Sequence, residues 1–252
     1  MNNKMMIFIA FIMNIIIIIL AYFSFAPIFA LSVYGELTSK SFSGNFRFFT
    51  NDGNLYSTLV SCILISFQIT ILFFKKNPNI IRNNILYLLS LASAVSELII
   101  LFVVLFVLLP MLKTLKILFG NFAMFNLHLL TPIIVTIRFL FFEKKRNNIS
   151  HIDSLYGSLP VLVYGVIVLF LVIIKVFNQE NNKIPYPFLN IYGNPWWVTF
   201  ISIIGIFGFT FGLCILLNYL NQLFENVLLD IEERNINFIT PTHSNQEKTY
   251  EL

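Results

Sequence analysis

The sequence consists mainly of long apolar runs separated by short polar segments. Each run has about 20 residues, the number that a helix rising 1.5 Å per residue needs to cross the roughly 30 Å hydrocarbon core of a bilayer. The pattern therefore predicts six membrane-spanning helices. They are Met5 to Phe25, Leu55 to Phe74, Ile85 to Leu109, Phe119 to Phe142, Leu155 to Phe177 and Trp196 to Leu220.

The first run requires a choice between a retained span and a cleaved signal peptide, because Lys4 precedes the apolar residues. The apolar region of a signal peptide normally has about 7–15 residues. The run here has about 20, which is the length of a span. We therefore expect it to stay in the protein.

Composition excludes a sizeable soluble domain. Hydrophobic residues make up 58% of the chain and charged residues 11%, whereas soluble domains usually carry about 25% charged residues. We expect an all-α, polytopic transmembrane helical bundle over residues 1–235, with the lipid bilayer as its partner. Residues 236–252 are polar and are expected to form a disordered tail, which makes His243 a poor site candidate.

The positions of the basic residues predict the orientation of the bundle. Six spans place both termini on one side, and that side carries ten of the lysines and arginines against six on the other. By the positive-inside rule, both termini are cytoplasmic. This distribution indicates membrane orientation, not nucleic-acid binding, in a multi-pass protein expected in the plasma membrane. Arg138, near the inner end of the fourth run, is expected to snorkel to the interface.

Two cysteines, Cys62 and Cys214, both lie inside apolar runs and show no metal-ligand spacing. We expect them to be small packing residues. Accordingly, the sequence predicts neither a metal ion nor a cofactor, and it leaves the oligomeric state open.

Two ionisable residues lie deep in the predicted membrane segments. Glu97 is near the centre of the third run, and His128 follows Asn126 in the outer half of the fourth. Burying such groups in lipid costs several kcal/mol unless partners compensate. Counted from the outer ends, Glu97 is roughly 18 Å deep and His128 roughly 13 Å deep, so the two can meet. The pair then either prepares a general base, with the carboxylate orienting the imidazole, or merely locks two helices together.

Two outer loops carry further polar groups. Thr50, Asp52 and Asn54 lead into the second run, and either Asp52 or Asn54 is expected to cap a helix that begins near Leu55. Tyr186 lies in a Pro-rich apolar segment between the fifth and sixth runs. With the termini inside, both loops face the same side as His128, which suggests a shared pocket.

Three segments carry a resemblance to a known family. They are Phe46-Arg47-Phe48-Phe49-Thr50, Leu127-His128-Leu129-Leu130-Thr131-Pro132 and Tyr186-Pro187-Phe188-Leu189. Their order and spacing over residues 45 to 220 resemble the androgen-induced and androgen-dependent multi-span hydrolases and their prokaryotic six-span relatives. The polar run from Asn51 to Asn54 is closer to the prokaryotic relatives.

The eukaryotic members of this family are threonine hydrolases that cleave fatty acid esters of hydroxy fatty acids. The resemblance implies Thr50 as the nucleophile, His128 as its base and a lipid-like substrate. The supporting residues expected around this pair are Glu97, Asp52, Asn54, Asn126 and Tyr186.

Two other classes of function stay open at this point. One is a small proton- or ion-coupled transporter in which Glu97 and His128 form a relay. The other is a non-catalytic membrane scaffold in which the Tyr-Pro-Phe-Leu segment is a packing element.

Overall fold

The computed structural model of the chain confirms the all-α, six-span architecture. It describes residues 3–33, 48–74, 76, 83–108, 122–144, 149–176 and 184–239, which are almost entirely helical and contain no strand. Six of the helices are long and apolar enough to cross a membrane. The predicted span ends at Leu109, Phe119 and Phe177 and residues 240–252 of the tail lie outside the described ranges.

The first three spans are α1 (Asn3–Val33), α3 (Phe49–Leu72) and α4 (Asn84–Val103), and α4 continues into the π-helical turn η2 (Val104–Leu108). The fourth span consists of α7 (Phe122–Phe125), the π-helical η3 (Asn126–Leu130) and α8 (Thr131–Phe142). The fifth consists of α9 (His151–Ser154), the 3-10 turn η4 (Leu155–Ser158) and α10 (Leu159–Ile173). A short turn, η5 (Pro187–Leu189), precedes α11 (Trp196–Ile239).

The start of the second span differs from the prediction. Helix α3 begins at Phe49, so Asp52 and Asn54 lie inside it and the expectation that one of them caps a helix at Leu55 is wrong. The N-cap residue is Phe48, which makes no side-chain cap bond. Contacts from elsewhere in the chain stabilise this start, because the Phe49 amide donates to the Tyr186 hydroxyl at 3.3 Å.

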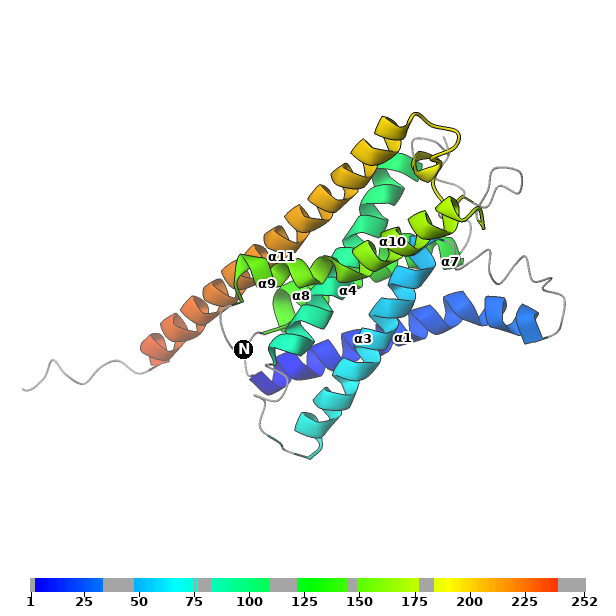
Figure 1. Cartoon of the computed structure of the whole chain (residues 1–252). Coiled ribbons are helices and arrows are strands. Elements are labelled where there is room, and N and C mark those ends of the chain that lie inside the picture. The colour runs from blue at the N-terminus through cyan, green and yellow to red at the C-terminus, as the bar shows by residue number, and fades with distance from the viewer. Residues whose placement is uncertain are drawn as a thin grey trace, which may run out of the picture.

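Helix α4 is the centre of the bundle (Figure 1). In its membrane-spanning window 61% of the residues are buried, against 22% in α11. Its buried face is rich in small side chains, among them Ser90, Ala92, Ser93, Ala94 and Ser96. Small residues let neighbouring helices approach closely within a membrane, which explains why α4 can be surrounded by α3, α8 and α11.

Helix α11 is longer than a membrane span requires. It runs from Trp196 to Ile239, so the expected domain boundary at residue 235 falls inside the helix. Its span ends at Leu228, and the rest continues beyond it. The start of α1 and the end of α11 lie at the same end of the bundle in Figure 1, as an even number of spans requires.

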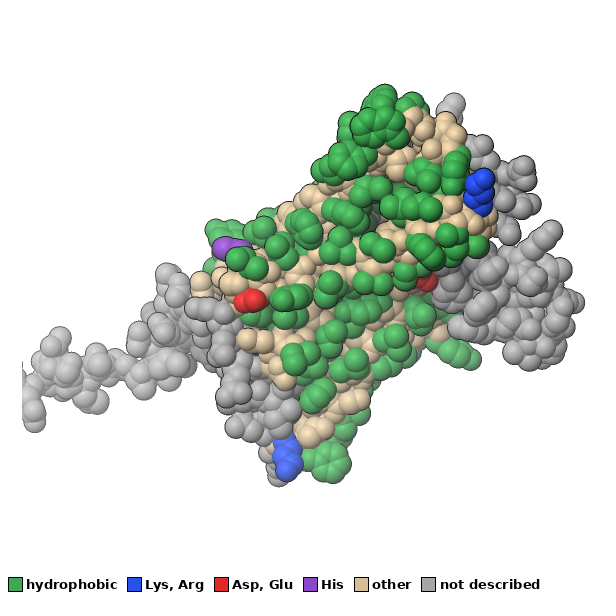
Figure 2. All heavy atoms as spheres, viewed as in Figure 1, with side chains coloured by type: hydrophobic (Ala, Val, Ile, Leu, Met, Phe, Trp, Pro, Cys, Tyr) green, Lys and Arg blue, Asp and Glu red, His purple; other side chains and the backbone are tan. Residues whose placement is uncertain are grey.

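The surface of the bundle is suited to lipid. Figure 2 shows a face made mostly of hydrophobic side chains, with few charged ones. Large side chains such as Phe170, Phe200 and Ile204 are more than half exposed. An exposed apolar surface of this extent is typical of contact with a membrane.

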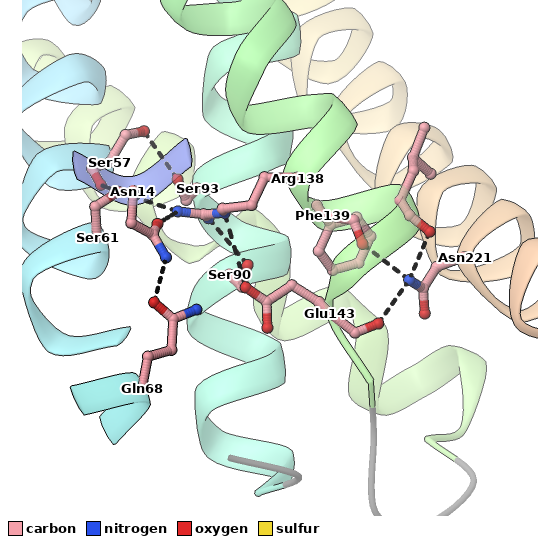
Figure 3. Close-up of polar contacts among 11 residues, drawn as sticks. Asn14, Ser57, Ser61, Gln68, Ser90, Ser93, Arg138, Phe139, Glu143 and Asn221 are labelled. Atoms are coloured by element: carbon pink, nitrogen blue, oxygen red, sulfur yellow. Dashed lines mark hydrogen bonds and ion pairs between the residues drawn. The ribbon is translucent and has the colours of Figure 1, made fainter. Parts of the chain in front are cut away.

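Arg138 does not snorkel to the interface but is fully buried among four helices (Figure 3). Its Nη1 donates to Asn14 Oδ1 on α1 at 2.6 Å and to Ser61 Oγ on α3 at 3.0 Å. Its Nη2 donates to Ser90 Oγ on α4 at 3.0 Å. The Nε atom lies 3.7 Å from the carboxylate of Glu143, just after α8. The expectation of snorkelling is wrong because three neighbouring helices supply hydrogen-bond acceptors inside the bundle.

Further polar contacts extend from this cluster toward α11. Asn221 on α11 donates to the carbonyls of Phe139 and Glu143 at 2.9 and 3.0 Å, as Figure 3 shows. The Tyr87 hydroxyl on α4 lies 2.9 Å from Asn218 Oδ1. Burial raises the pKa of the Glu143 carboxyl, while the neighbouring Arg138 acts in the opposite direction. Every span except the fifth contributes a side chain or a backbone carbonyl to this connected set.

We predict that Arg138→Leu destabilises the bundle by about 3–5 kcal/mol, because it leaves the buried Glu143 carboxylate without its cation. Thermal unfolding of the detergent-solubilised protein measures the loss. The double variant Arg138→Leu/Glu143→Leu should recover part of it, since it removes both charges. Lys76→Leu, at an exposed position after α3, is the control and should unfold like the wild type. A single Arg138→Leu variant as stable as that control would contradict the prediction.

Candidate functional site

Asn54 joins the start of α3 to the fourth span. It is buried, and its Nδ2 donates both to the Thr50 carbonyl at 2.8 Å and to the Leu127 carbonyl at 2.9 Å. One amide group therefore holds the first turn of α3 against η3. Two of the three segments that carry the family resemblance meet here.

The π-helical geometry around His128 has a local cause. Pro132 lacks the N–H group that would bond the His128 carbonyl in a regular α-helix. The Thr131 amide instead reaches back to the Asn126 carbonyl, which closes a wider turn over Asn126–Leu130. Single π-helical turns inside α-helices are frequent at functional sites.

The imidazole of His128 is held in one tautomer by the backbone. Its Nδ1 lies 2.9 Å from the Met124 carbonyl. Because a carbonyl can only accept a hydrogen bond, Nδ1 carries the proton and Nε2 keeps its lone pair. His128 is 8% exposed. The ring is thus preset to accept a proton at Nε2, which is the state that a general base requires.

The start of α3 places Thr50 about one helical turn from the level of His128. Asn54 bonds Leu127, and further along the same helices Ser61 bonds Arg138, so α3 and the fourth span run parallel. Thr50 is one helical turn before Asn54, and Met124 is about one turn before Leu127. Thr50 is therefore level with Met124, whose carbonyl bonds the His128 ring.

Glu97 does not pair with His128 as expected. Its side chain has no exposed surface, and neither carboxylate oxygen forms a hydrogen bond with any residue that the structure describes. The polar side chains close enough to influence it are Ser57 and Arg138. The Met124 carbonyl takes the orienting role that the sequence suggested for Glu97.

Asn126 ties the site to the first span. Its Nδ2 donates to the Leu20 carbonyl at 2.8 Å and to the Ser24 hydroxyl. Its Oδ1 accepts from the Thr131 hydroxyl at 3.0 Å. The first two contacts hold η3 against α1 and the third lies within the fourth span, so Asn126 supports the position of His128.

Tyr186 brings the third segment to the same corner of the molecule. Its hydroxyl accepts from the Phe49 amide, and its ring stacks on Phe188 with centroids 5.4 Å apart. Phe49 also packs against Tyr164 of α10 at 5.1 Å. Burial raises the pKa of Tyr186, while the hydrogen bond from the Phe49 amide acts in the opposite direction.

Asp52 lines a groove between α3 and α10, and His128 does not. The groove has a volume of about 300 Å³ and is lined mainly by apolar side chains, with Asp52, Tyr56 and Tyr164 as its polar members. Val163 and Ile167 on its α10 wall are about half exposed. The groove therefore opens sideways, toward the region that lipid chains occupy.

We predict that Asn54→Asp destabilises the protein by at least about 1–3 kcal/mol, because it removes both donor bonds while keeping the side-chain shape. Asn83→Asp is a matched control. Asn83 uses only its oxygen, which accepts from the Ile85 amide at 2.9 Å, so aspartate can replace it. Thermal unfolding in detergent compares the two variants, and equal stability would show that the Asn54 bridge is dispensable.

No protein-family model matches the chain, and the comparisons with curated proteins and with solved structures also found no match. The resemblance to the multi-span hydrolases therefore stays a prediction that rests on the three motifs.

Proposed function

We propose that this protein hydrolyses fatty acid esters within the outer half of the plasma membrane, with Thr50 as the nucleophile and His128 as its base. The observation that carries the proposal is the Asn54 bridge, which holds the backbone of Thr50 beside that of Leu127. Because His128 follows Leu127, the two residues implied by the family resemblance share one corner of the bundle.

The reaction uses the tautomer described above. Nε2 of His128 takes the Thr50 hydroxyl proton as Oγ1 attacks the ester carbonyl carbon, and a hydroxyl becomes an effective nucleophile only with such a base. The bond to the alcohol then breaks, and His128 returns the proton to the departing alkoxide. Thr50 is left carrying the acyl group.

Water completes the cycle. His128 accepts a proton from the incoming water, whose oxygen attacks the acyl carbon, and Thr50 is released with its proton restored. The products are an alcohol and a fatty acid. The positive end of the α3 dipole lies at Thr50 and favours the negative charge that develops on the carbonyl oxygen in both steps.

The groove between α3 and α10 is suited to the substrate's hydrocarbon chain. Its apolar lining matches an acyl chain, and its sideways opening gives access from the bilayer without passage through water. Asp52 and Thr50 both lie in the first turn of α3, on different sides of the helix. A chain in the groove therefore reaches the first turn of α3, the turn that carries Thr50, and the ester has to cross from Asp52 to Thr50 around the helix tip.

The transport hypothesis has less support. It needs Glu97 and His128 as consecutive members of a relay, but each side chain interacts with other groups. The scaffold hypothesis does not account for a histidine whose Nδ1 is bonded and whose Nε2 is available. Both observations favour the hydrolase.

We predict that Thr50→Ala and His128→Ala each lower esterase activity by about 100-fold or more, the usual scale of a general-base contribution. The assay is hydrolysis of p-nitrophenyl octanoate by the detergent-solubilised protein, with fluorophosphonate labelling as a second readout. Thr58→Ala is the matched control, because the Thr58 hydroxyl only bonds the Asn54 carbonyl of its own helix. Activity in folded Thr50→Ala protein equal to that of Thr58→Ala would rule out Thr50 as the nucleophile.

We predict that Val163→Trp, which fills the groove, reduces the rate with the same long-chain ester by about 10-fold. Val166→Trp is the control, since Val166 is equally lipid-exposed on α10 but does not line the groove. A short-chain ester, p-nitrophenyl acetate, should be affected little by either change. If both tryptophan variants behave alike with the long ester, the groove does not hold the chain.

A further inference from the structure

Three buried oxygen atoms on α3 and α4 have no hydrogen-bond donor among the residues that the structure describes. They are both carboxylate oxygens of Glu97 and Oδ1 of Asn54. Glu97 is 0% exposed and Asn54 1%. Buried acceptors without donors are rare in native proteins, because each loses its water without replacement. These three oxygens therefore favour a protonation state of the site that supplies a donor.

The register of the two helices places these oxygens at one level. Ser93 on α4 donates to Ser57 on α3 at 2.9 Å, and α3 and α4 run antiparallel. Glu97 is one turn outward from Ser93, and Asn54 is one turn outward from Ser57. One residue before Asn54, a Cβ at Gly53 would lie 2.8 Å from Ile100 Cδ1, so the Ile100 side chain of α4 packs directly on the α3 backbone at this height.

The side-chain amide of Asn54 is already held in place through its nitrogen atom. Its Nδ2 is bonded to the carbonyls of Thr50 and Leu127, which leaves Oδ1 directed away from them. The Ser57 hydroxyl accepts the Ser93 bond, so its own hydrogen is available, and Ser57 is close enough to influence Glu97. One further donor is needed to satisfy all three oxygens.

The ionisable groups buried inside the bundle also indicate that one more proton is needed. Arg138 on α8 is close enough to Glu97 to interact with it electrostatically, and its Nε lies 3.7 Å from the Glu143 carboxylate. The polar side chains that α1 and α3 place around these groups include Asn14, Ser57 and Ser61, all of which are neutral. With both carboxylates ionised, these three buried ionisable groups would hold one net negative charge inside the membrane, at a cost of several kcal/mol.

We propose that Glu97 is a proton-binding site in the membrane interior, where its carboxyl donates a hydrogen bond to Asn54 Oδ1. A single proton satisfies the Asn54 oxygen and neutralises the charge. The second Glu97 oxygen accepts from the Ser57 hydroxyl. Glu97 is then a positioning residue that acts through Asn54 on the junction of α3 and η3. This site stands independently of the proposed hydrolase, since neither argument for it uses the chemistry at Thr50.

Infrared spectroscopy of the full chain in lipid vesicles at neutral pH tests the proposal. The wild type should show the carbonyl band of a protonated carboxylic acid, with the expected shift in deuterium oxide, and Glu97→Gln should lose it. Asn54→Ala should move the band to higher frequency, because the hydrogen bond from the acid is gone. Glu143→Gln is the matched control and should keep the band.

Stability gives a second and separate readout. Glu97→Gln keeps a neutral group with a donor for Asn54, so its unfolding temperature should stay close to that of the wild type, whereas Glu97→Ala should lower it. The proposal is overturned if Glu97→Gln fails to fold, or if it retains the infrared band. It is also overturned if Glu143→Gln removes the band, or if sodium ions remove it and raise the unfolding temperature, which would identify a cation site. Esterase activity is not needed to decide among these outcomes.

Discussion

The arrangement of this bundle depends on one constraint: a guanidinium group in a membrane interior needs hydrogen-bond acceptors at fixed positions. Arg138 finds them on α1, α3 and α4. Apolar helices in lipid have little hydrophobic preference for one register over another, because lipid chains are as apolar as leucine. Sliding any of these three helices along its neighbours would remove an acceptor from Arg138. A single charged residue thus sets the relative heights of four spans.

Those heights also fix the contacts at the end of the bundle where α3 begins. Asn54 lies two turns from Ser61 toward the start of α3, on the same face of the helix. It reaches the carbonyl of Leu127 only if α3 and the fourth span have the correct register. The relative position of the proposed Thr50 and His128 pair depends on the same register. The site is therefore positioned by contacts between helices and not by any local motif of its own, although its residues come from short recognisable segments.

The sequence was sufficient for the architecture and insufficient for the contacts. A long apolar run indicates a membrane span whatever its internal periodicity. The six spans and their order could therefore be predicted to within a few residues at most ends. The start of α3 was missed because Phe49 is stabilised by Tyr186, 137 residues away along the chain. The burial of Arg138 was missed because its acceptors also come from distant parts of the chain. Serines at helical spacing in α3 and α4 did indicate a polar interior face. The pairing of Glu97 with His128 failed because depth alone does not say which face of a helix a residue occupies.

The π-helical turn at Asn126–Leu130 has a consequence for how this chain tolerates insertions and deletions. Such a turn holds one residue more than an α-helical turn would. Because the extra residue is taken up within the wider turn, the helix keeps its phase on the two sides of it. Deleting one residue in the regular helix between this turn and Arg138 would instead rotate one side against the other by about 100°. With Arg138 fixed, that rotation would carry the Leu127 carbonyl away from Asn54. The fourth span therefore tolerates a change of length within Asn126–Leu130 better than in the helix that follows.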